Sequence, residues 1–384
     1  MTMPSGERIG HHYSHAQLLV SLPGGLDHRA SLDAIVVPTA RTPQHLDNAI
    51  ALARTLDCSL LVLCSKDARA DWAAERASGV KDCFAVDIGA PRMPRFETSG
   101  FLPSSLSRRT DTSLKRNVGL AVAVMAGWRR VVFLDDDMVI QRAENVLEAV
   151  RLLDELAAVG LKNDGFPDNS VVCHALRAVG KRQDSFIGGG ALAVVAGPNT
   201  SFFPTVYNED WFFLLDSDDG LNPVTVAGAV TQEAFNPYEN PDRAASEEFG
   251  DCLAEGVYAL LDNGGSLRDA DDSYWQQFLK DRSLMIADIQ ARTPGLAWPL
   301  AEKNQLRLAL EAALGQLARI SPQHCTSYLD LWQRDRKRWR DYLGSMPVVG
   351  APEALRRLGM VPAKRQGRFE SRSRIGTLRT DCLE

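Results

Sequence analysis

Three consecutive aspartates, Asp135-Asp136-Asp137, follow directly after Val131-Val132-Phe133-Leu134, whose branched and aromatic side chains are typical of a buried strand. Adjacent carboxylates repel one another, so a site that keeps all three ionised usually supplies a cation. In an extended chain Asp135 and Asp137 point to one side and Asp136 to the other. Two convergent carboxylates suit Mg²⁺ or Mn²⁺, with substrate phosphates completing the coordination shell. The alternative is a solvated acidic turn.

A second group with chemical potential is Lys115-Arg116-Asn117, which lies in the first turn of a helix predicted from Asp111-Thr112-Ser113 to about residue 126. The amide dipole at a helix N-terminus disfavours cations. Lys115 and Arg116 at this position therefore indicate that an anion binds nearby. The alternative is a pair of solvated basic side chains.

A third candidate is the pair Glu209-Asp210, which precedes Trp211-Phe212-Phe213. Apolar surroundings raise the pKa of a carboxyl group toward values that are useful for a general base. The alternative is a helix N-terminus that carries acidic residues. Upstream, Gly188-Gly189-Gly190 permits close approach of the backbone to a ligand or to a neighbouring chain. These glycines lack the spacing of a dinucleotide-binding fingerprint.

The elements that must position these residues follow an α/β pattern. Apolar strands are predicted at 34–37, 60–64, 84–88, 131–134, 191–196 and 224–230, and helices at 43–56, 113–126, 143–158 and 170–179. Uniformly apolar strands separated by helices indicate a mostly parallel sheet with helices on both faces. Ligands bind outside the carboxyl ends of the strands in such sheets. Arg41, Asp67 and the aspartate triplet all fall at such ends.

The composition is that of an ordinary globular protein, with 384 residues, 45% hydrophobic and 24% charged residues, and a net charge of −6. This charge gives no reason to expect nucleic acid as a partner. The seven cysteines are scattered and form no CxxC pair, so we expect buried thiols in a reducing compartment. The sequence has no apolar run of transmembrane length and no signal core, which predicts a cytoplasmic protein.

The chain is predicted to divide into four parts: a flexible N-terminal extension (1–30), a catalytic domain (31–265), a helical extension (266–346) and a basic tail (347–384). Gly264-Gly265 marks the second boundary. The extension carries His11, His12 and His15, for which a flexible polar tail is preferred over a metal site. The tail contains Lys364, Arg365, Arg368, Arg372, Arg374 and Arg379 and is interpreted as solvated.

Taken together, these residues resemble the nucleotide-sugar glycosyltransferases of the GT-A fold, particularly the inverting family 2. The resemblance rests on Phe133-Leu134-Asp135-Asp136-Asp137 as a DxD-type metal motif and on Lys115-Arg116-Asn117-Val118-Gly119-Leu120-Ala121 as the helix before it. Gly188-Gly189-Gly190 and Glu209-Asp210 follow in the expected order. The resemblance covers roughly residues 32–262 and implies a GT-A-like (Rossmann-like) sheet, followed by a helical extension without a counterpart.

The resemblance also implies roles for individual residues. Asp137 would bind Mg²⁺ or Mn²⁺ directly, Asp135 would contact the metal or the donor ribose, and Asp210 would be the catalytic base, with Glu209 beside it. The residues around the nucleotide, ribose and diphosphate would be Pro38, Thr39, Arg41, Asp67, Lys115, Arg116, Asn117, Asp136 and Gly189.

The function implied is metal-dependent transfer of a hexose from a nucleoside-diphosphate sugar to a hydroxyl of a small or soluble acceptor, with inversion. A metal and nearby cations would stabilise the leaving diphosphate, and a carboxylate would take the acceptor proton. Three alternatives remain open: a retaining GT-A glycosyltransferase, a sugar-phosphate nucleotidyltransferase and a non-catalytic nucleotide-sugar-binding protein. The sequence does not determine the oligomeric state, and a homo-oligomer is one of the possibilities.

Overall fold

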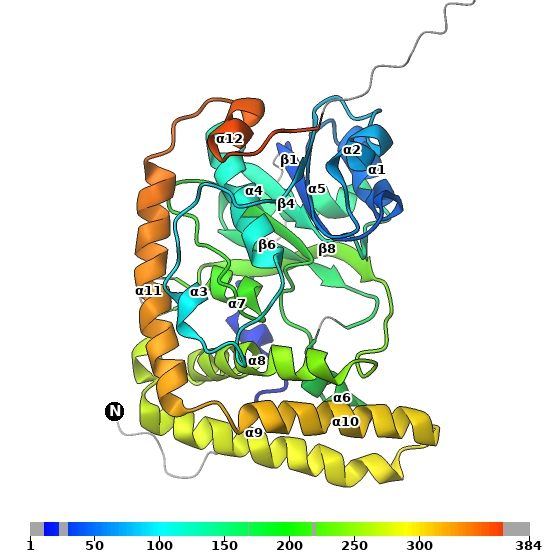
Figure 1. Cartoon of the computed structure of the whole chain (residues 1–384), viewed down its shortest axis with the longest axis vertical. Coiled ribbons are helices and arrows are strands. Elements are labelled where there is room, and N and C mark those ends of the chain that lie inside the picture. Colours follow the sequence, from blue (N-terminus) through cyan, green and yellow to red (C-terminus); the bar gives the residue numbers. More distant parts are fainter. Residues whose placement is uncertain (1–10, 23–29, 168, 217–219, 364–384) are drawn as a thin grey trace, which may run out of the picture.

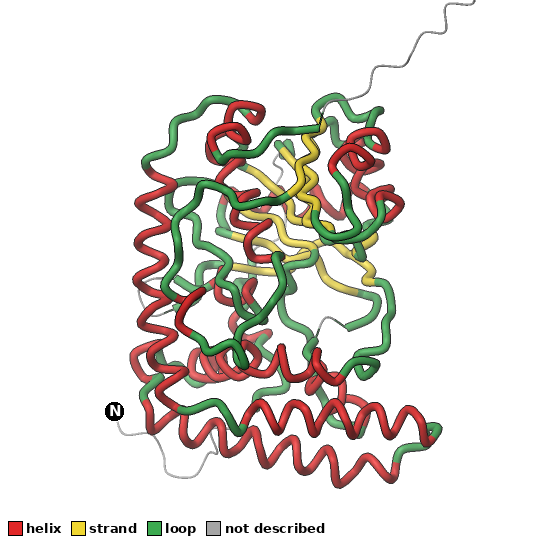
Figure 2. The backbone as a smooth tube through the Cα atoms, viewed as in Figure 1, coloured by secondary structure: helices red, strands yellow, loops and turns green. Residues whose placement is uncertain are grey.

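The computed structural model describes residues 11–22, 30–167, 169–216 and 220–363, which form a mixed α/β arrangement (Figure 1). The strands gather in one half of the molecule with helices around them, and the other half is mostly helical, as Figure 2 shows. The basic residues from Lys364 onward lie outside the described residues, as does Cys382. Within the described ranges, no helix combines the length and the apolar character needed to span a lipid bilayer.

The strands of the described chain form one eight-stranded sheet in the order β3-β2-β1-β4-β7-β6-β8-β5. Strands β3, β2, β1 and β4 are parallel neighbours, and so are β6 and β8, whereas β7 is antiparallel to both β4 and β6, and β5 is antiparallel to β8. The sheet is therefore mixed, and the prediction of a mostly parallel sheet is confirmed only for its first half. The strands are β1 (Ala34–Thr39), β2 (Ser59–Cys64), β3 (Cys83–Asp87), β4 (Arg130–Leu134), β5 (Met138–Val139), β6 (Ala158–Asn163), β7 (Ala191–Val195) and β8 (Val224–Gln232).

The sequence pattern did not predict strand β6 or the two-residue strand β5. Helix α5 (Ala143–Arg151) was expected to continue to residue 158, but a 3₁₀ turn (Leu152–Asp154) ends it and β6 begins at Ala158. Position 160 of this strand requires glycine, because a Cβ atom there would approach within 2.8 Å of the Ile187 side chain. This glycine lowers the strand propensity of a short segment, so tertiary packing rather than local preference places it in the sheet.

Alternating side chains of the parallel strands feed two hydrophobic layers. In β1, Ile35 and Val37 pack with α1 (Asp47–Thr55), α2 (Ala70–Arg76) and α5 on one face. Val36 points to the other face, where it packs with α4 (Thr112–Ala126). A sheet buried on both faces explains why its strands are apolar throughout rather than alternating. The prediction of helices on both faces is confirmed for this part of the sheet.

The helical region beyond residue 265 packs into the same hydrophobic layer as α4. Its buried tryptophans Trp275, Trp332 and Trp339 belong to one continuous cluster with Val36 and Phe133 of the sheet. Helices α9 and α10 lie along one end of the molecule, and α11 runs along its side toward α12 (Figure 1). The remaining helices are α3 (Thr98–Phe101), α6 (Val171–Ala178), α7 (Glu209–Leu214), α8 (Pro241–Asp262), α9 (Asp272–Arg292), α10 (Leu300–Leu317), α11 (Pro322–Gly344) and α12 (Ala351–Arg357).

A buried ion-pair group joins α8 to α9. Arg282 is 2% exposed, and its Nε and Nη2 atoms donate to the two carboxylate oxygens of Glu248 at 2.7 and 2.9 Å. Its Nη2 also donates to Asp251 Oδ2 at 2.6 Å, and Ser170 donates to the same oxygen at 2.6 Å. Buried charges are tolerated when they are paired and hydrogen-bonded in this way.

The N-terminal segment 11–22 is not a free extension. A 3₁₀ turn (Ala16–Leu18) packs near α8, and the N–H of Val20 donates to the carbonyl of Val224 at 2.9 Å. His15 is buried and hydrogen-bonds Asp262 and Glu255. Burial would lower the pKa of His15, but these two carboxylates raise it to about 9. The polar residues that indicated a flexible tail are therefore partners of acids on α8.

Candidate active site

The topology leaves a crevice between β1 and β4. The chain leaves β1 toward β2 and later returns to place β4 on the other side of β1, so the loops that follow the two strands diverge. Such switch points are where open α/β sheets bind ligands. A cleft of about 200 Å³ lies here, lined by Pro38, Thr39, Ala40, Arg41, Lys66, Thr110, Asp111, Thr112, Lys115, Asp135, Asp136 and Asp137.

The aspartate triplet forms a turn rather than an extended strand end. The N–H of Met138 donates to the carbonyl of Asp135 at 3.1 Å, and the three carboxylates therefore reach different partners. Asp136 accepts from Thr39 Oγ1 at 2.5 Å and from Arg41 Nε at 2.9 Å. Asp137 receives only a long contact, from Gln232 Nε2 at 3.5 Å, among the described side chains. The expected arrangement, with Asp135 and Asp137 on one side and Asp136 on the other, is therefore wrong, because in the turn each of the three carboxylates has its own partners.

Arg116 links Asp135 to Glu209 beneath the cleft. The Arg116 side chain is buried. Its Nη2 donates to both oxygens of Asp135 at 3.1 and 2.9 Å, and its Nη1 donates to Glu209 Oε1 at 3.0 Å. Arg108 Nη1 donates to the other Glu209 oxygen at 2.8 Å. Burial raises the pKa of Asp135 to about 7, although Arg116 opposes this shift. The Arg116 charge is therefore compensated by the protein's own carboxylates.

Asp210 lies close to Arg116 and is held by the backbone. Its Oδ2 accepts from the N–H of Gly189, and its Oδ1 accepts from the N–H of Trp211 at 2.9 Å. Burial and the neighbouring Glu209 raise the pKa of Asp210 to about 6, while Arg116 acts in the opposite direction. Within the described chain, Asp210 lines a separate small cavity of about 20 Å³ and not the cleft above the triplet.

Gly189 permits this arrangement because it has no side chain. A Cβ atom at this position would lie 2.4 Å from Arg116 Nη1 and 2.9 Å from Asp210 Cβ. The close approach expected of the glycine triplet is therefore made to two charged side chains of the protein. Gly190 is similarly constrained, because its Cβ would lie 2.3 Å from the Met138 Cε.

Three further residues selected from the sequence occupy different surroundings. Lys115 Nζ donates to the Thr39 carbonyl at 2.8 Å and to Ser65 Oγ at 2.6 Å, and it pairs with Asp111 at 3.0 Å, so it ties the ends of β1 and β2 together. Asn117 exchanges two hydrogen bonds of 2.8 Å with the backbone of Phe203 and faces the core instead of the cleft. Asp67 is exposed beside the cleft residue Lys66.

Several residues of the site were not singled out by the sequence pattern. Arg108 comes from the long loop before α4, and Gln232 and Glu233 lie at the end of β8, with Glu233 pairing with Arg41 at 3.3 Å. A polar pair at the end of a strand was the available signal for Gln232 and Glu233, since the same reasoning identified the aspartate triplet. Arg108 carried no signal beyond its place in a basic loop.

The donor set at the cleft fits a hard divalent cation best at Asp137. Both oxygens of Asp135 accept hydrogen bonds from Arg116, and Asp136 is held by Thr39 and Arg41. The carboxylate of Asp137 is half-buried and, within the described chain, has the fewest hydrogen bonds of the three. Carboxylate oxygens are the ligands that Mg²⁺ and Mn²⁺ prefer.

Two larger clefts complete the surroundings. A groove of about 600 Å³, lined by parts of segments 104–110 and 240–247, shares Thr110 with the cleft at the triplet. Another cleft, of about 470 Å³, lies at the other end of the strands, near the amino ends of β4, β6 and β8. The site described above is the one at the carboxyl ends of the parallel strands, where a ligand is expected.

The sequence matches no known family model and no curated protein. Among solved structures, it is similar to the mannosyltransferase PcManGT from Pyrobaculum calidifontis in complex with GDP-Man and Mn²⁺, with 15% identity and a TM-score of 0.41, over 81% of this chain and 88% of that one. It is also similar to the apo structure of the bifunctional glycosyltransferase WbbM, with 10% identity and a TM-score of 0.28, over 73% of this chain and 52% of that one. Both TM-scores are below 0.5, so the interpretation of the site rests on its own geometry.

Proposed function

We propose that the protein is a glycosyltransferase that uses a divalent metal ion to move a hexose from a nucleoside-diphosphate sugar to an acceptor hydroxyl. The observation that carries this proposal is the cleft between β1 and β4, where the lightly bonded carboxylate of Asp137 stands beside Arg41 and Lys115. A cation and a diphosphate could share such a cleft, because it offers both carboxylate and basic groups. The preferred ions are Mg²⁺ and Mn²⁺.

In this proposal the donor nucleotide lies over the carboxyl ends of β1 and β4. Pro38, Thr39 and Arg41 would contact its base and ribose, as supported by their position along the cleft wall. Asp137, with Asp135 beside it, would hold the metal. When bound, the metal supplies Lewis-acid stabilisation of the charge on the leaving diphosphate. Lys115 and Arg116 add positive charge below the cleft at fixed positions, because both are hydrogen-bonded and buried.

Asp210 is the proposed catalytic base. It lines the small separate cavity and neither the cleft nor the groove, so this role requires that the bound substrates open a path to its carboxylate. Its pKa of about 6, raised chiefly by burial, leaves it ionised at neutral pH yet basic enough to accept a proton. The N–H groups of Gly189 and Trp211 fix its orientation. Glu209 would hold Arg116 in place beside it. Attack by the acceptor opposite the leaving diphosphate would invert the anomeric configuration.

The groove that continues from the cleft at Thr110 is the proposed acceptor site. Its volume of about 600 Å³ is sufficient for a small soluble molecule, and its lining contains Ser105, Arg108 and Asn240. These polar side chains suit the hydroxyl groups of a sugar or a similar acceptor.

The proposal is tested by binding and turnover with a panel of nucleotide sugars in the presence and absence of Mn²⁺. Metal-dependent release of nucleoside diphosphate supports glycosyl transfer or hydrolysis. Release of pyrophosphate from sugar phosphate and nucleoside triphosphate would instead identify a nucleotidyltransferase. Binding without turnover would identify a nucleotide-sugar-binding protein, and product with the donor's anomeric configuration would identify a retaining enzyme. Failure to bind any nucleoside diphosphate with Mn²⁺ would refute the proposal.

Asp137→Ala provides the residue-level test. We expect nucleoside-diphosphate affinity measured with Mn²⁺ to fall by at least about tenfold, because the carboxylate best placed to hold the ion is lost. Asp164→Ala is the matched control, since Asp164 is an exposed acid in the turn after β6. Unchanged Mn²⁺-dependent affinity in Asp137→Ala would contradict the assigned role.

A further inference from the structure

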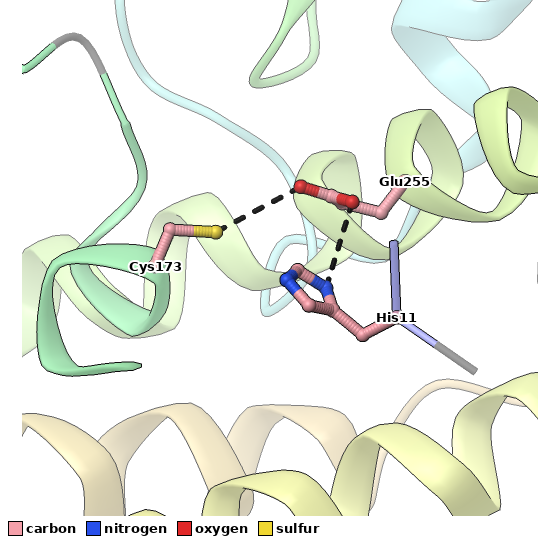
Figure 3. A group of neighbouring side chains, drawn as sticks. All are labelled: His11, Cys173 and Glu255. Carbon is pink, nitrogen blue, oxygen red and sulfur yellow. Dashed lines mark hydrogen bonds and ion pairs between the residues drawn. The ribbon is translucent and has the colours of Figure 1, made fainter. Parts of the chain in front are cut away.

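A second cluster of ligating side chains lies away from the cleft, where three separate segments meet (Figure 3). His11 comes from the N-terminal segment, Cys173 from α6 and Glu255 from α8. One donor atom of each lies within 4.8 Å of the others. The Cys173 thiol donates to Glu255 Oε1 at 3.7 Å, and His11 Nδ1 lies 3.6 Å from Glu255 Oε2.

The orientation of the His11 ring is set by its other nitrogen. His11 Nε2 hydrogen-bonds the side-chain oxygen of Gln183, which accepts only. Nε2 must therefore carry the proton, and in the neutral ring Nδ1 presents a lone pair toward Cys173 and Glu255. In the described part of the chain, this buried Nδ1 has no hydrogen-bond donor facing it. Metal-binding histidines commonly show this pattern, with the second ring nitrogen donating to a fixed acceptor.

The cluster borders the small cavity already described behind Asp210. The cavity has a volume of about 20 Å³ and is lined by Cys173 and Glu255 together with polar groups such as Ser170 and Asn208. This space holds about one water-sized particle. The cavity could therefore hold the one water molecule that completes the coordination of an ion bound between the three side chains.

We propose that His11, Cys173 and Glu255 form a binding site for Zn²⁺. One sulfur, one nitrogen and one oxygen ligand are the donors that Zn²⁺ accepts, whereas Mg²⁺ and Mn²⁺ favour oxygen ligands. On binding, the Cys173 thiol loses its proton to solvent and the thiolate takes its place at the ion. A water molecule from the cavity would supply the fourth ligand. The site would fasten segment 11–22 to helices α6 and α8.

This site is distinct in position and chemistry from the proposed ion at Asp137. It belongs to the helical layer and depends on a thiolate, so it can be present whether or not the protein transfers sugars. Its competing interpretation is a hydrogen-bonded group without metal, in which His11 is protonated and pairs with Glu255. The two interpretations predict different behaviour toward added metal.

The test uses the full-length protein, stripped with a chelator and titrated with Zn²⁺ by calorimetry, with elemental analysis for stoichiometry. Co²⁺ substitution should give a thiolate-to-cobalt charge-transfer band, which ions at Asp137 cannot produce. We expect one Zn²⁺ per chain, a band that disappears in Cys173→Ser, and an affinity at least about tenfold lower in His11→Ala. Gln183→Leu should weaken binding by roughly 10–100-fold, because it frees the histidine ring.

Matched controls are Cys325→Ser and His45→Ala, which alter a buried cysteine and a histidine outside the cluster. Both should bind Zn²⁺ like the wild type, and saturating Zn²⁺ should raise the Tm of the wild type and controls but not of Cys173→Ser. Circular dichroism checks that each variant is folded. His11→Ala is the variant expected to disturb folding least, because His11 lies outside the sheet and the long helices. Absence of stoichiometric Zn²⁺, or a cobalt spectrum unchanged by Cys173→Ser, would overturn the proposal.

Discussion

Substitution of Gly189 by alanine tests whether Arg116 is locked in place by its neighbours. The added Cβ would lie 2.4 Å from Arg116 Nη1, whereas ordinary contacts begin near 3.4 Å, so Nη1 must retreat by about 1 Å. Arg116 is buried and is also held by Asp135, so it has little room to move. The same Cβ would press on Asp210 at 2.9 Å.

The cost follows from these distances. A retreat of about 1 Å would break the 3.0 Å hydrogen bond from Arg116 Nη1 to Glu209, and a hydrogen bond to a charged group contributes roughly 1.5–3 kcal/mol. Overpacking in a dense interior adds about 1–3 kcal/mol. Because the two terms overlap, we expect Gly189→Ala to lower the free energy of unfolding by roughly 2–4 kcal/mol. For a chain of this length, that loss corresponds to a fall in Tm of roughly 2–5 °C.

The assay compares thermal and urea unfolding of Gly189→Ala with those of Gly197→Ala. Gly197 is the matched control because it follows the other end of β7 and its added Cβ would meet no atom within 4 Å. In an Arg116→Met background the penalty for alanine at 189 should shrink, since the guanidinium that it strikes is gone, but it should stay above the control value because the contact with the Asp210 Cβ remains. Equal stability of the two alanine variants, or an undiminished penalty in the Arg116→Met background, would refute the reasoning.

Two further predictions concern buried charges. Because the pKa of Asp210 is raised to about 6, the folded protein holds this proton more tightly than the unfolded chain does, so the stability contributed by the group is lost as pH rises through about 6. In the proposed reaction Asp210 acts as a base in its ionised form, so turnover should fall as pH drops below about 6. Asp210→Asn should lower kcat by roughly 10²–10⁴-fold in a steady-state assay and spare donor binding. Arg282→Met should cost about 3–5 kcal/mol in urea unfolding, because it leaves Glu248 buried without its cation, whereas Arg292→Met, at an exposed pair, should leave the stability almost unchanged. Equal effects of the two arginine changes would contradict this account of the buried pair.

Local patterns were sufficient for the first half of the sheet. The strands β1, β2 and β4 are uninterrupted apolar runs that are buried on both faces, so hydrophobicity alone identifies them. Strand direction was harder, because the apolar run of β7 reads the same in either orientation. Its antiparallel placement depends on which neighbours it contacts, a property of the whole chain.

The candidate site was predicted in its residue types but not in its pairings. The sequence placed Arg116 near an anion, and it is held by Asp135 and Glu209, which are 19 and 93 positions away in the chain. Such pairings cannot be inferred from local spacing, because they depend on how α4, β4 and α7 pack. Asn117 illustrates the same limit, since its helical position allowed either a ligand or the Phe203 backbone as its partner.

The charge balance around the cleft bears on the order in which ligands bind. Arg116 and Arg41 are paired with Asp135 and Asp136, so each already has a carboxylate partner. Among the described residues, the carboxylate of Asp137 has only the long contact from Gln232, and no arginine or lysine is hydrogen-bonded to it. An anion that enters the cleft alone would therefore be repelled by the uncompensated carboxylate of Asp137, whereas a divalent cation would be attracted to it. In the proposed reaction the metal should accordingly bind before the nucleotide or together with it, and nucleotide alone should bind weakly.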